Sequence, residues 1–574
     1  MLKDRIFRVQ GSNYYDDEIL QTSRTHTDEK LSAIANAGFT GIWLHAVLRE
    51  LIPTNLFKKY IRNSEKRLAA LGKLCKRAEK FGLGVWIYCT EPLGLAENHP
   101  FWKKHPELKG HWTFIPTEPP AAFSLCSSTP AVQNFLEEGF NKLFKKIPLA
   151  GVILITASEH VSNCWASTPS NPSYSNMFRL RKCTCPRCSI REPIEVISEI
   201  ITLISRGTTS ARPNAKVVAW DWSWNMHLDP PYRKLIDMLP KDVILMGDFE
   251  RGGRIVRAGK ERLVEEYSLV YPGPSQRFRS EVKIIPKNRK LWTKLQINTT
   301  HELATVPNLP LMVSLYRKFK FLKQTKAVGT MTTWNFGCSV DTLNVFAVRK
   351  LITDKSLKQE NSWLESLAIE YFGKRADSEK IVKAWYGFQR ACSYYPLNGL
   401  TFLYRGPMNY SLAYPLKLIF ENKPMGPSWR KHNFGDRLED TFSGFTENEI
   451  IRLLGQLSNR WLKSVNDYEQ ALANSDRQER KTKELNVARV VGCCFRSTWN
   501  IYRWHNLRKR KKTHKIGKSE REIIADEISN LQTALPLVES DSRLGYHEEA
   551  QCYMFTSKAI KQKIGQLQKL IDSK

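Results

Sequence analysis

Short apolar runs alternate with amphipathic helical segments from about residue 28 to 350, and this alternation limits the fold of the 574-residue chain more than any other feature. Such alternation is typical of βαβ units, whose strands form a parallel sheet. Segment 153–159 (ILITASE) is the clearest strand, an apolar and β-branched run that ends at the carboxylate of Glu159. This composition indicates a strand that is buried on both faces.

Eight runs of this kind are predicted to be strands, the number found in a closed (β/α)8 barrel. They cover residues 40–45, 85–89, 122–127, 152–156, 216–222, 243–246, 291–298 and 329–334. Each run ends in polar or aromatic residues, and the active site of a barrel of this type lies where its strands end. The sequence therefore predicts an α/β, TIM-type barrel in residues 1–350.

Strand patterns fade after residue 350, and helical periodicity continues to the end of the chain. The predicted helices cover residues 362–372, 378–394, 447–471, 481–504, 520–537 and 554–571. Segment 395–445 contains proline and glycine residues that interrupt the helical pattern. Residues 351–574 are therefore expected to form an all-helical region, either in one piece or as two subdomains.

The composition is that of a soluble globular protein, with 42% hydrophobic and 25% charged residues. There is no apolar run of about 18 residues, and the first residues lack a signal-peptide pattern, so neither a membrane span nor secretion is predicted. Several of the 12 cysteines lie inside apolar runs, as reduced core thiols do. These are Cys89, Cys126, Cys338, Cys493 and Cys494. Together these features predict a cytoplasmic protein.

The formal net charge of +31 is unusually positive and leaves two interpretations open. Such a charge attracts polyanions, among them acidic polysaccharides, but a general bias toward lysine and arginine produces it without any specific partner. The densest basic run is 508–512, with Lys515 and Lys518 nearby. No helix-turn-helix, RNA-recognition or zinc-finger pattern accompanies it, so a nucleic-acid partner is not favoured. The sequence does not constrain the oligomeric state.

Two glutamates follow strands that are remote from each other in the sequence. Glu159 follows the fourth predicted strand and Glu302 follows the seventh, and these strands face each other across the mouth of such a barrel. Two carboxylates about 5 Å apart can cleave a glycosidic bond, because one protonates the leaving oxygen while the other attacks the sugar carbon. We therefore predict Glu159 as the acid/base, Glu302 as the nucleophile and no cofactor for catalysis. The alternative is that each glutamate caps a helix or pairs with an arginine.

Further polar and aromatic residues near strand ends are predicted to bind the substrate. Sugar rings present apolar C–H faces that stack on indoles, so tryptophan at these positions favours a carbohydrate ligand. The predicted substrate-binding residues are His45, Arg49, Asp221, Trp222, Trp224, Asp248, Glu250, His301, Trp334, Tyr546 and His547. Arg49 would contact an acidic group if the glycan is anionic. Salt bridges are the alternative for the three acidic residues, and in a substrate-assisted reaction Asp221 would instead orient an N-acetyl group of the sugar.

Four cysteines near the fourth strand have the spacing of a metal site. Cys185 and Cys188 form a C-x2-C pair, and Cys164 and Cys183 would complete four sulfur ligands. Because four sulfurs leave no open coordination position, the predicted zinc is structural and would hold the loop that follows Glu159. Four free thiols are the alternative.

Six segments together resemble a group of barrel glycoside hydrolases that are related to the β-N-acetylhexosaminidases. They are segments 155–159 (ITASE), 185–188 (CPRC), 219–224 (AWDWSW), 298–302 (NTTHE), 333–337 (TWNFG) and 541–548 (DSRLGYHE). The resemblance implies sugar hydrolysis and an acid after the fourth strand.

One residue departs from the pattern of that group. The best-known hexosaminidases have aspartate directly before the catalytic glutamate, whereas this chain has Ser158. The departure favours the two-glutamate, retaining scheme over the substrate-assisted one. A non-catalytic protein that binds carbohydrates or polyanions is the remaining alternative.

Overall fold

The computed structural model describes residues 2–12, 16–113, 121–157, 160–166, 168, 182–298, 300–334, 339–354, 357, 359–397, 406–425, 435–548 and 550–572. The chain divides into two compact units, each built from several segments. Unit 1 contains residues 1–249, 277–295 and 325–332, and unit 2 contains residues 250–276, 296–324 and 333–574. The boundary at residue 350 stays a prediction, because each unit groups several stretches of chain.

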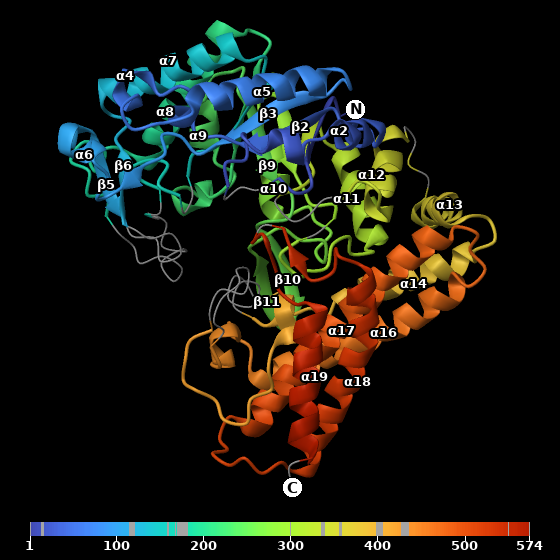
Figure 1. Ribbon diagram of the computed structural model, residues 1–574. Helices are drawn as coiled ribbons and strands as arrows, with labels where there is room; N and C mark the ends of the chain where they lie inside the picture. Colours follow the sequence, from blue (N-terminus) through green and yellow to red (C-terminus); the bar gives the residue numbers. More distant parts are fainter. Residues whose placement is uncertain are drawn as a thin grey trace. The chain divides into compact units, whose positions relative to one another are not determined.

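Eight parallel strands close into a barrel in unit 1 (Figure 1). In ring order they are β1 (Asp4–Arg8), β2 (Gly41–His45), β3 (Gly84–Cys89), β7 (Gly151–Ile155), β8 (Lys216–Trp220), β9 (Ile244–Asp248), β12 (Leu291–Lys294) and β13 (Ala327–Met331), which pairs with β1. The predicted TIM-type barrel is confirmed.

The predicted set of barrel strands omits one strand and includes one that lies elsewhere. Residues 4–8 form β1, which hydropathy does not reveal because only Ile6 and Phe7 are apolar and the buried Arg8 pairs with Glu18. The predicted third strand, β6 (Ala122–Leu125), lies instead in a three-stranded antiparallel sheet with β4 (Leu95–Ala96) and β5 (Lys109–Thr113). The two errors cancel, so β7 is still the fourth barrel strand.

The amino-terminal end of the barrel is filled by two indole rings. Trp86 and Trp292 have ring centroids 4.9 Å apart. Glycines on neighbouring strands leave room for them, since a Cβ atom at Gly151 would lie 2.5 Å from Trp86 and one at Gly329 would lie 2.3 Å from Trp292. This end is therefore packed core, as expected for a barrel of this size.

Amphipathic helices surround the barrel, with α5, α7, α8 and α9 outside the strands in Figure 1. The longer ones are α2 (Asp28–Asn36), α5 (Ser64–Glu79), α7 (Pro130–Lys146), α8 (Pro193–Ala211), α9 (Arg233–Met238) and α10 (Gln276–Ile284). The short ones are α1 (Thr22–Thr25), α3 (Leu48–Leu51), α4 (Thr54–Phe57), α6 (Phe101–Lys104), η1 (Pro106–Leu108) and η3 (Trp224–Met226). Helix α5 buries Leu71, Leu74, Cys75 and Ala78 on one face, as its periodicity predicts.

Unit 2 is mostly helical, and the six helices predicted beyond residue 350 are confirmed to within a few residues. They are α13 (Glu360–Phe372), α14 (Ser378–Cys392), α16 (Glu447–Ala471), α17 (Gln478–Arg508), α18 (Lys518–Ser540) and α19 (Ser557–Asp572). Unit 2 also contains β10 (Gly253–Arg257), β11 (Lys260–Val264), α11 (Met312–Gln324), α12 (Leu343–Thr353), η4 (Met408–Ala413), η5 (Leu438–Thr441), β14 (Tyr546–His547) and β15 (Cys552–Tyr553). Helix α17 packs between α16 and α18, and α18 also packs on α19 (Figure 1).

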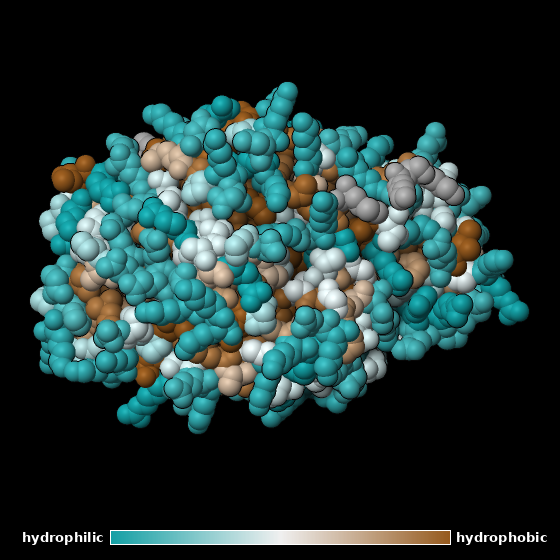
Figure 2. Space-filling view, turned by 90° about the horizontal axis from the view of Figure 1, so that it is seen from above, coloured by the Kyte–Doolittle hydropathy of each residue, from teal (hydrophilic) through white to brown (hydrophobic). Residues whose placement is uncertain are grey.

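Among the described residues, no helix is both long and apolar enough to cross a bilayer. The face drawn in Figure 2 is mainly hydrophilic, and its hydrophobic residues form small, separated groups.

Candidate functional site

Glu159, the predicted acid/base, is followed in the sequence by a residue that the structure describes. Ser158 and Glu159 lie outside the described residues, between the end of β7 and His160. The ring of His160 is close enough to His45, at the end of β2, for its charge to help lower the pKa of His45. Thus the chain directly after Glu159 lies near the carboxyl end of another barrel strand.

His45 belongs to a buried polar group at the ends of β1 and β2. The Glu18 carboxylate lies 2.7 Å from the Arg8 guanidinium and accepts a hydrogen bond of 2.8 Å from the His45 backbone N–H. Burial lowers the pKa of His45 to about 3, with smaller contributions from the charges of His160 and Arg8. The imidazole is therefore neutral at physiological pH.

Asp221 and Asp248 belong to a second buried network, at the ends of β8 and β9. The Asp221 carboxylate accepts hydrogen bonds from the Arg277 guanidinium and, at 3.1 Å, from the Asp248 backbone N–H. The Asp248 carboxylate accepts one from the Trp220 indole at 2.9 Å and lies 3.8 Å from Arg277. Both oxygens of Asp221 are engaged, so the salt-bridge alternative describes its state, and an N-acetyl group would have to displace one of these partners.

The barrel strand that precedes Glu302 in the sequence ends in a lysine. Strand β12 ends at Lys294 rather than at Asn298, so Glu302 follows the strand end by eight positions. The Lys294 side chain is fully buried, and its Nζ lies 5.9 Å from the centre of the Trp220 ring. The sequence pattern does not reveal Lys294 as a strand end, because the apolar pattern continues through Leu295 and Ile297, which are buried outside the strand.

The three tryptophans at the end of β8 and directly after it differ in exposure. Trp220 is fully buried, and Trp224 is 1% exposed, with its indole N–H 3.4 Å from the Thr156 hydroxyl. Trp222 is half-buried, and its ring centroid lies 5.7 Å from that of Trp220. Of these three indoles, Trp222 is the one with surface left for a sugar ring.

Arg49 is buried at the start of the chain segment that follows β2. Its guanidinium donates hydrogen bonds to the carbonyls of Leu93 at 2.5 Å and Gly94 at 3.3 Å. These two carbonyl oxygens therefore occupy guanidinium N–H groups of Arg49 that an acidic sugar group would need. Its contact with an anionic glycan stays a prediction.

Glu302, the predicted nucleophile, lies in unit 2 as a buried carboxyl group. Burial raises its pKa to about 8, although the Ser268 hydroxyl and the Lys318 ammonium oppose the shift. The Tyr395 hydroxyl donates a 2.9 Å hydrogen bond to the Glu302 carbonyl and fixes the backbone there. At neutral pH this carboxyl group is therefore protonated in most molecules, whereas a nucleophile must be ionised.

Glu250 lies beside Glu302 in unit 2 and has a lysine partner. Its carboxylate accepts hydrogen bonds from the fully buried Lys318 ammonium and, at 3.1 Å, from the Gln296 backbone N–H. Lys318 also donates to the Ser268 carbonyl at 2.8 Å. This arrangement satisfies a buried charge, as the salt-bridge alternative for Glu250 requires.

His301 and Trp334 gather around Tyr267 in unit 2. The Tyr267 and His301 rings are stacked with centroids 5.7 Å apart, and Trp334 lies 6.3 Å from Tyr267. The His301 imidazole is 3.5 Å from the Glu266 carboxylate. Glu266 and Tyr267 were not predicted, because an acidic residue followed by an aromatic one is a weak sequence signal.

Tyr546 and His547 form strand β14 in unit 2. The backbone N–H of Gly545, directly before this strand, donates a 2.9 Å hydrogen bond to the Thr305 carbonyl. The hairpin of β14 and β15 therefore lies against the chain that follows Glu302. Burial lowers the pKa of His547 to about 3, so this imidazole is also neutral.

The cysteine cluster differs from the predicted set by one member. The sulfurs of Cys126, Cys164, Cys185 and Cys188 all lie within 4.8 Å of one another. Cys126 was expected to be a core thiol. It is the fourth member of the cluster in place of Cys183, because the chain directly after β6 reaches the other three sulfurs. Cys338, also expected in the core, lies outside the described residues.

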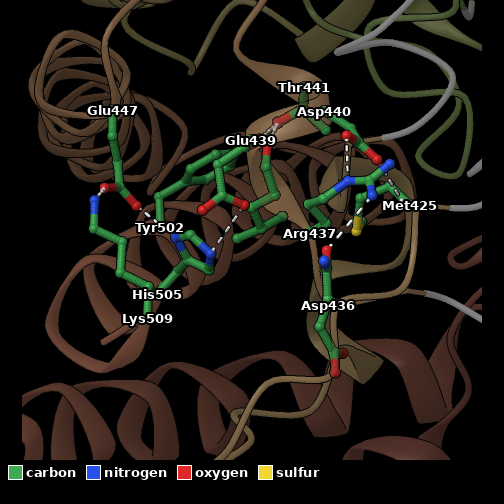
Figure 3. Close-up of polar contacts among 12 residues, drawn as sticks. Met425, Asp436, Arg437, Glu439, Asp440, Thr441, Glu447, Tyr502, His505 and Lys509 are labelled. Atoms are coloured by element: carbon green, nitrogen blue, oxygen red, sulfur yellow. Dashed lines mark hydrogen bonds and ion pairs between the residues drawn. The ribbon is translucent and has the colours of Figure 1, made fainter. Parts of the chain in front are cut away.

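Three residues of the basic run 508–512 serve packing within unit 2. The buried Arg508 donates to the Leu418 carbonyl and pairs with Glu520, which also pairs with Lys511. Lys509 pairs with Glu447. Figure 3 shows the other oxygen of Glu447 on the His505 imidazole, at 2.6 Å. These contacts hold the end of α17, so this run gives little support to a polyanion site.

Neither known protein families nor curated proteins match the chain. Solved structures with similarity include the catalytic domain of β-amylase from Paenibacillus polymyxa, with 11% identity, 64% of this chain and 98% of that chain covered, and a TM-score of 0.35. A GH5_18 protein from Streptomyces cattleya in complex with GlcNAc has 12% identity, with 62% and 82% covered and a TM-score of 0.35. A GH36 α-galactosidase from Geobacillus stearothermophilus has 16% identity, covers 38% of this chain and has a TM-score of 0.24. This chain spans 27% of that enzyme's length, and at these TM-scores the likenesses carry no argument about activity.

Proposed function

We propose that this chain is a glycoside hydrolase whose active site lies at the carboxyl ends of the barrel strands. The observation that carries the proposal is the contrast between the two ends of the barrel. Indoles fill the amino-terminal end, while the opposite strand ends carry acidic, basic and aromatic side chains, among them Asp248, Lys294 and Trp222. Barrel enzymes hold their active sites at this carboxyl end.

In the proposed reaction Glu159 is the acid/base. Its carboxyl proton moves to the glycosidic oxygen while the bond from that oxygen to the anomeric carbon breaks. In the two-glutamate scheme the Glu302 carboxylate forms the new bond to that carbon, and water later cleaves the glycosyl ester as Glu159 takes a proton back. The substrate is an oligosaccharide or a simple glycoside, and no cofactor takes part.

The raised pKa of Glu302 favours a second scheme as the alternative. A protonated Glu302 cannot attack the sugar, and a substrate-assisted reaction does not need it to, because the N-acetyl oxygen is then the nucleophile. In that case Asp221, now held by Arg277, would orient the N-acetyl group after releasing one of its partners. The two schemes differ in their pH dependence, since the Glu302 scheme requires activity to rise as the pH approaches the pKa of about 8.

Glu159→Gln tests the acid role with two leaving groups. Phenyl glycosides need a proton on the departing oxygen, so kcat/KM for them should fall by about 100-fold to 10,000-fold, whereas 2,4-dinitrophenyl glycosides should keep most of their rate. The matched control is Glu138→Gln on α7, whose side chain is 61% exposed. Unchanged turnover of phenyl glycosides by Glu159→Gln would refute the assignment, and no turnover of any glycoside by the unaltered chain would favour a binding protein.

Glu302→Gly with added azide tests the nucleophile. If Glu302 attacks the sugar, azide should restore turnover and yield a glycosyl azide of inverted configuration. Absence of rescue, combined with faster reaction of N-acetylated than of plain glycosides, would favour the substrate-assisted scheme.

A further inference from the structure

Four cysteine sulfurs from three separate stretches of unit 1 meet in one buried cluster. Cys126 follows β6, Cys164 lies in the segment after β7, and Cys185 and Cys188 form a C-x2-C turn in which the Ser189 N–H donates to the Cys185 carbonyl at 2.9 Å. All four side chains are buried, and none of the four is in a disulfide. Four cysteine sulfurs are one of the ligand sets of structural zinc sites.

The spacing of the sulfurs fits a tetrahedral metal ion. With metal–sulfur bonds of about 2.3 Å, a zinc ion places its four sulfurs about 3.8 Å apart. The Cys126 sulfur lies 3.5 Å from that of Cys185 and 3.7 Å from that of Cys188, and no pair in the cluster exceeds 4.8 Å.

Donors around the cluster match thiolates rather than neutral thiols. The Arg187 guanidinium donates to the Cys126 sulfur at 3.2 Å, and the Ser124 hydroxyl donates to the Cys164 sulfur at 3.4 Å. The Ser128 hydroxyl is 3.3 Å from the Cys188 sulfur. Four thiolates around a divalent ion carry a net charge of −2, which a guanidinium and hydroxyl donors stabilise in a buried site.

Gly110 shows how closely the surrounding chain approaches the cluster. A Cβ atom at this position of β5 would lie 2.5 Å from the Cys164 sulfur and 2.4 Å from the Ser124 hydroxyl. The glycine therefore leaves room for the sulfur and for its hydrogen-bond donor.

We propose that Cys126, Cys164, Cys185 and Cys188 bind one structural zinc ion, and that Cys183 is not a ligand. On binding, the four thiols lose their protons and the ion joins three segments: the end of β6, the chain after β7, and the C-x2-C turn. With four sulfur ligands the ion has no open position, so its role is to stabilise the fold and not to activate water. The proposal does not depend on the activity proposed above.

Metal analysis of the full chain tests the ligand set. The chain, purified under reducing conditions without chelators, should hold about one zinc per chain, and Cys183→Ser, the matched control, should keep it. Cys126→Ser should lose most of the zinc, while Cys126→His should retain it because imidazole is also a zinc ligand. A metal-free unaltered chain would overturn the proposal, as would loss of zinc from Cys183→Ser but not from Cys126→Ser.

Cobalt substitution gives a result even if Cys126→Ser does not fold. Co²⁺ in the unaltered chain should show the intense visible bands of tetrahedral cobalt and near-ultraviolet thiolate-to-cobalt charge transfer. Cys183→Ser should leave both unchanged, whereas Cys126→His should weaken the charge-transfer band by about one quarter, since one of four sulfurs is replaced. Weak octahedral bands in the unaltered chain, or iron in place of zinc in the purified protein, would contradict the assignment.

Discussion

Two buried lysines of unit 2 have nearly the same surroundings, although one packs against the chain that leaves a barrel strand and the other lies among C-terminal helices. Lys318 pairs with Glu250 and donates to the Ser268 carbonyl at 2.8 Å. Lys563 pairs with Glu527 and donates to the Ser411 carbonyl at 2.9 Å. Both lysines are at most 2% exposed.

A carboxylate after a barrel strand is therefore not a site residue for that reason alone. Glu250 was predicted to bind the substrate from its position, yet its environment is the one that Glu527 has far from any barrel strand in the sequence. A buried charge needs a partner and hydrogen bonds wherever it lies. If Glu250 contacts the substrate, changes to the Lys318–Glu250 pair must therefore affect the kinetics in a way that changes to the Lys563–Glu527 pair do not.

The largest effect is expected when one partner of either pair is removed. Lys318→Met and Lys563→Met each leave a buried carboxylate without its cation, so each should lower the free energy of unfolding by about 3–5 kcal/mol in denaturant titrations. Double variants that also carry Glu250→Gln or Glu527→Gln should recover much of this loss. If Glu250 contacts the substrate, the Glu250 variants alone will change KM, and equal kinetics in both pairs would contradict that role.

Glu302 should make the stability of unit 2 depend on pH. Between its ordinary pKa of 4.5 and its value of about 8, the folded chain holds a proton that the unfolded chain has lost. The stabilisation is complete below pH 4.5 and is lost as the pH rises to 8, a change of about 4–5 kcal/mol. Glu302→Gln should flatten the profile.

Glu484 provides the control for this pH dependence. It is also buried in unit 2, with a pKa of about 7, and lies far from Glu302 in the sequence. Glu484→Gln should make the profile less steep between about pH 4.5 and 7, where both groups contribute, and leave the part between pH 7 and 8, which Glu302 alone produces. A profile that is the same in both variants and in the unaltered chain would refute the raised pKa values.

Trp222 and Trp224 should separate ligand binding from packing. Trp222→Ala removes a half-buried indole, so it should weaken oligosaccharide binding about 10-fold and cost at most about 1 kcal/mol of stability. Trp224→Phe, in the core, should instead lower stability and leave the dissociation constant unchanged. Isothermal titration and thermal unfolding measure both quantities, and equal affinity in Trp222→Ala would remove Trp222 from the site.

The smallest effect is expected in the basic run. Arg510→Gln and Lys512→Gln change exposed side chains and should shift the free energy of unfolding by no more than about 0.5 kcal/mol. Arg508→Gln, which breaks a buried pair with Glu520, is the comparison and should cost several times more. A large loss of heparin binding in Arg510→Gln and Lys512→Gln would instead support the polyanion alternative.

Periodicity was sufficient to predict the barrel and the C-terminal helices, since both follow from alternating burial. It failed where charge is buried, as in β1, where the partner of Arg8 lies ten positions away at Glu18. It also failed where apolar residues are buried outside regular structure, as after Lys294. Both failures arise because hydropathy describes burial and not hydrogen-bond pairing.

The candidate site was harder to predict than the fold. Residue type and position identified His45, Asp221 and Asp248 at strand ends, but not Arg277, Lys294 or Tyr267, which pair with or lie beside predicted residues. The C-x2-C motif located the cysteine cluster, yet spacing selected Cys183 where the fold brings Cys126. Partners that approach from a different part of the chain leave no local pattern.

The chain passes into unit 2 three times, and this has a consequence for shortened forms of the protein. Residues 302–305 are held by hydrogen bonds from the Tyr395 hydroxyl to the Glu302 carbonyl, from the Ala304 N–H to Asn409, and from the Gly545 N–H to the Thr305 carbonyl. A chain cut at residue 350 would keep these four residues and lose all three of their supports. Recombinant barrels made in this way should be prone to proteolysis between residues 296 and 324, and co-expression of residues 351–574 should protect them.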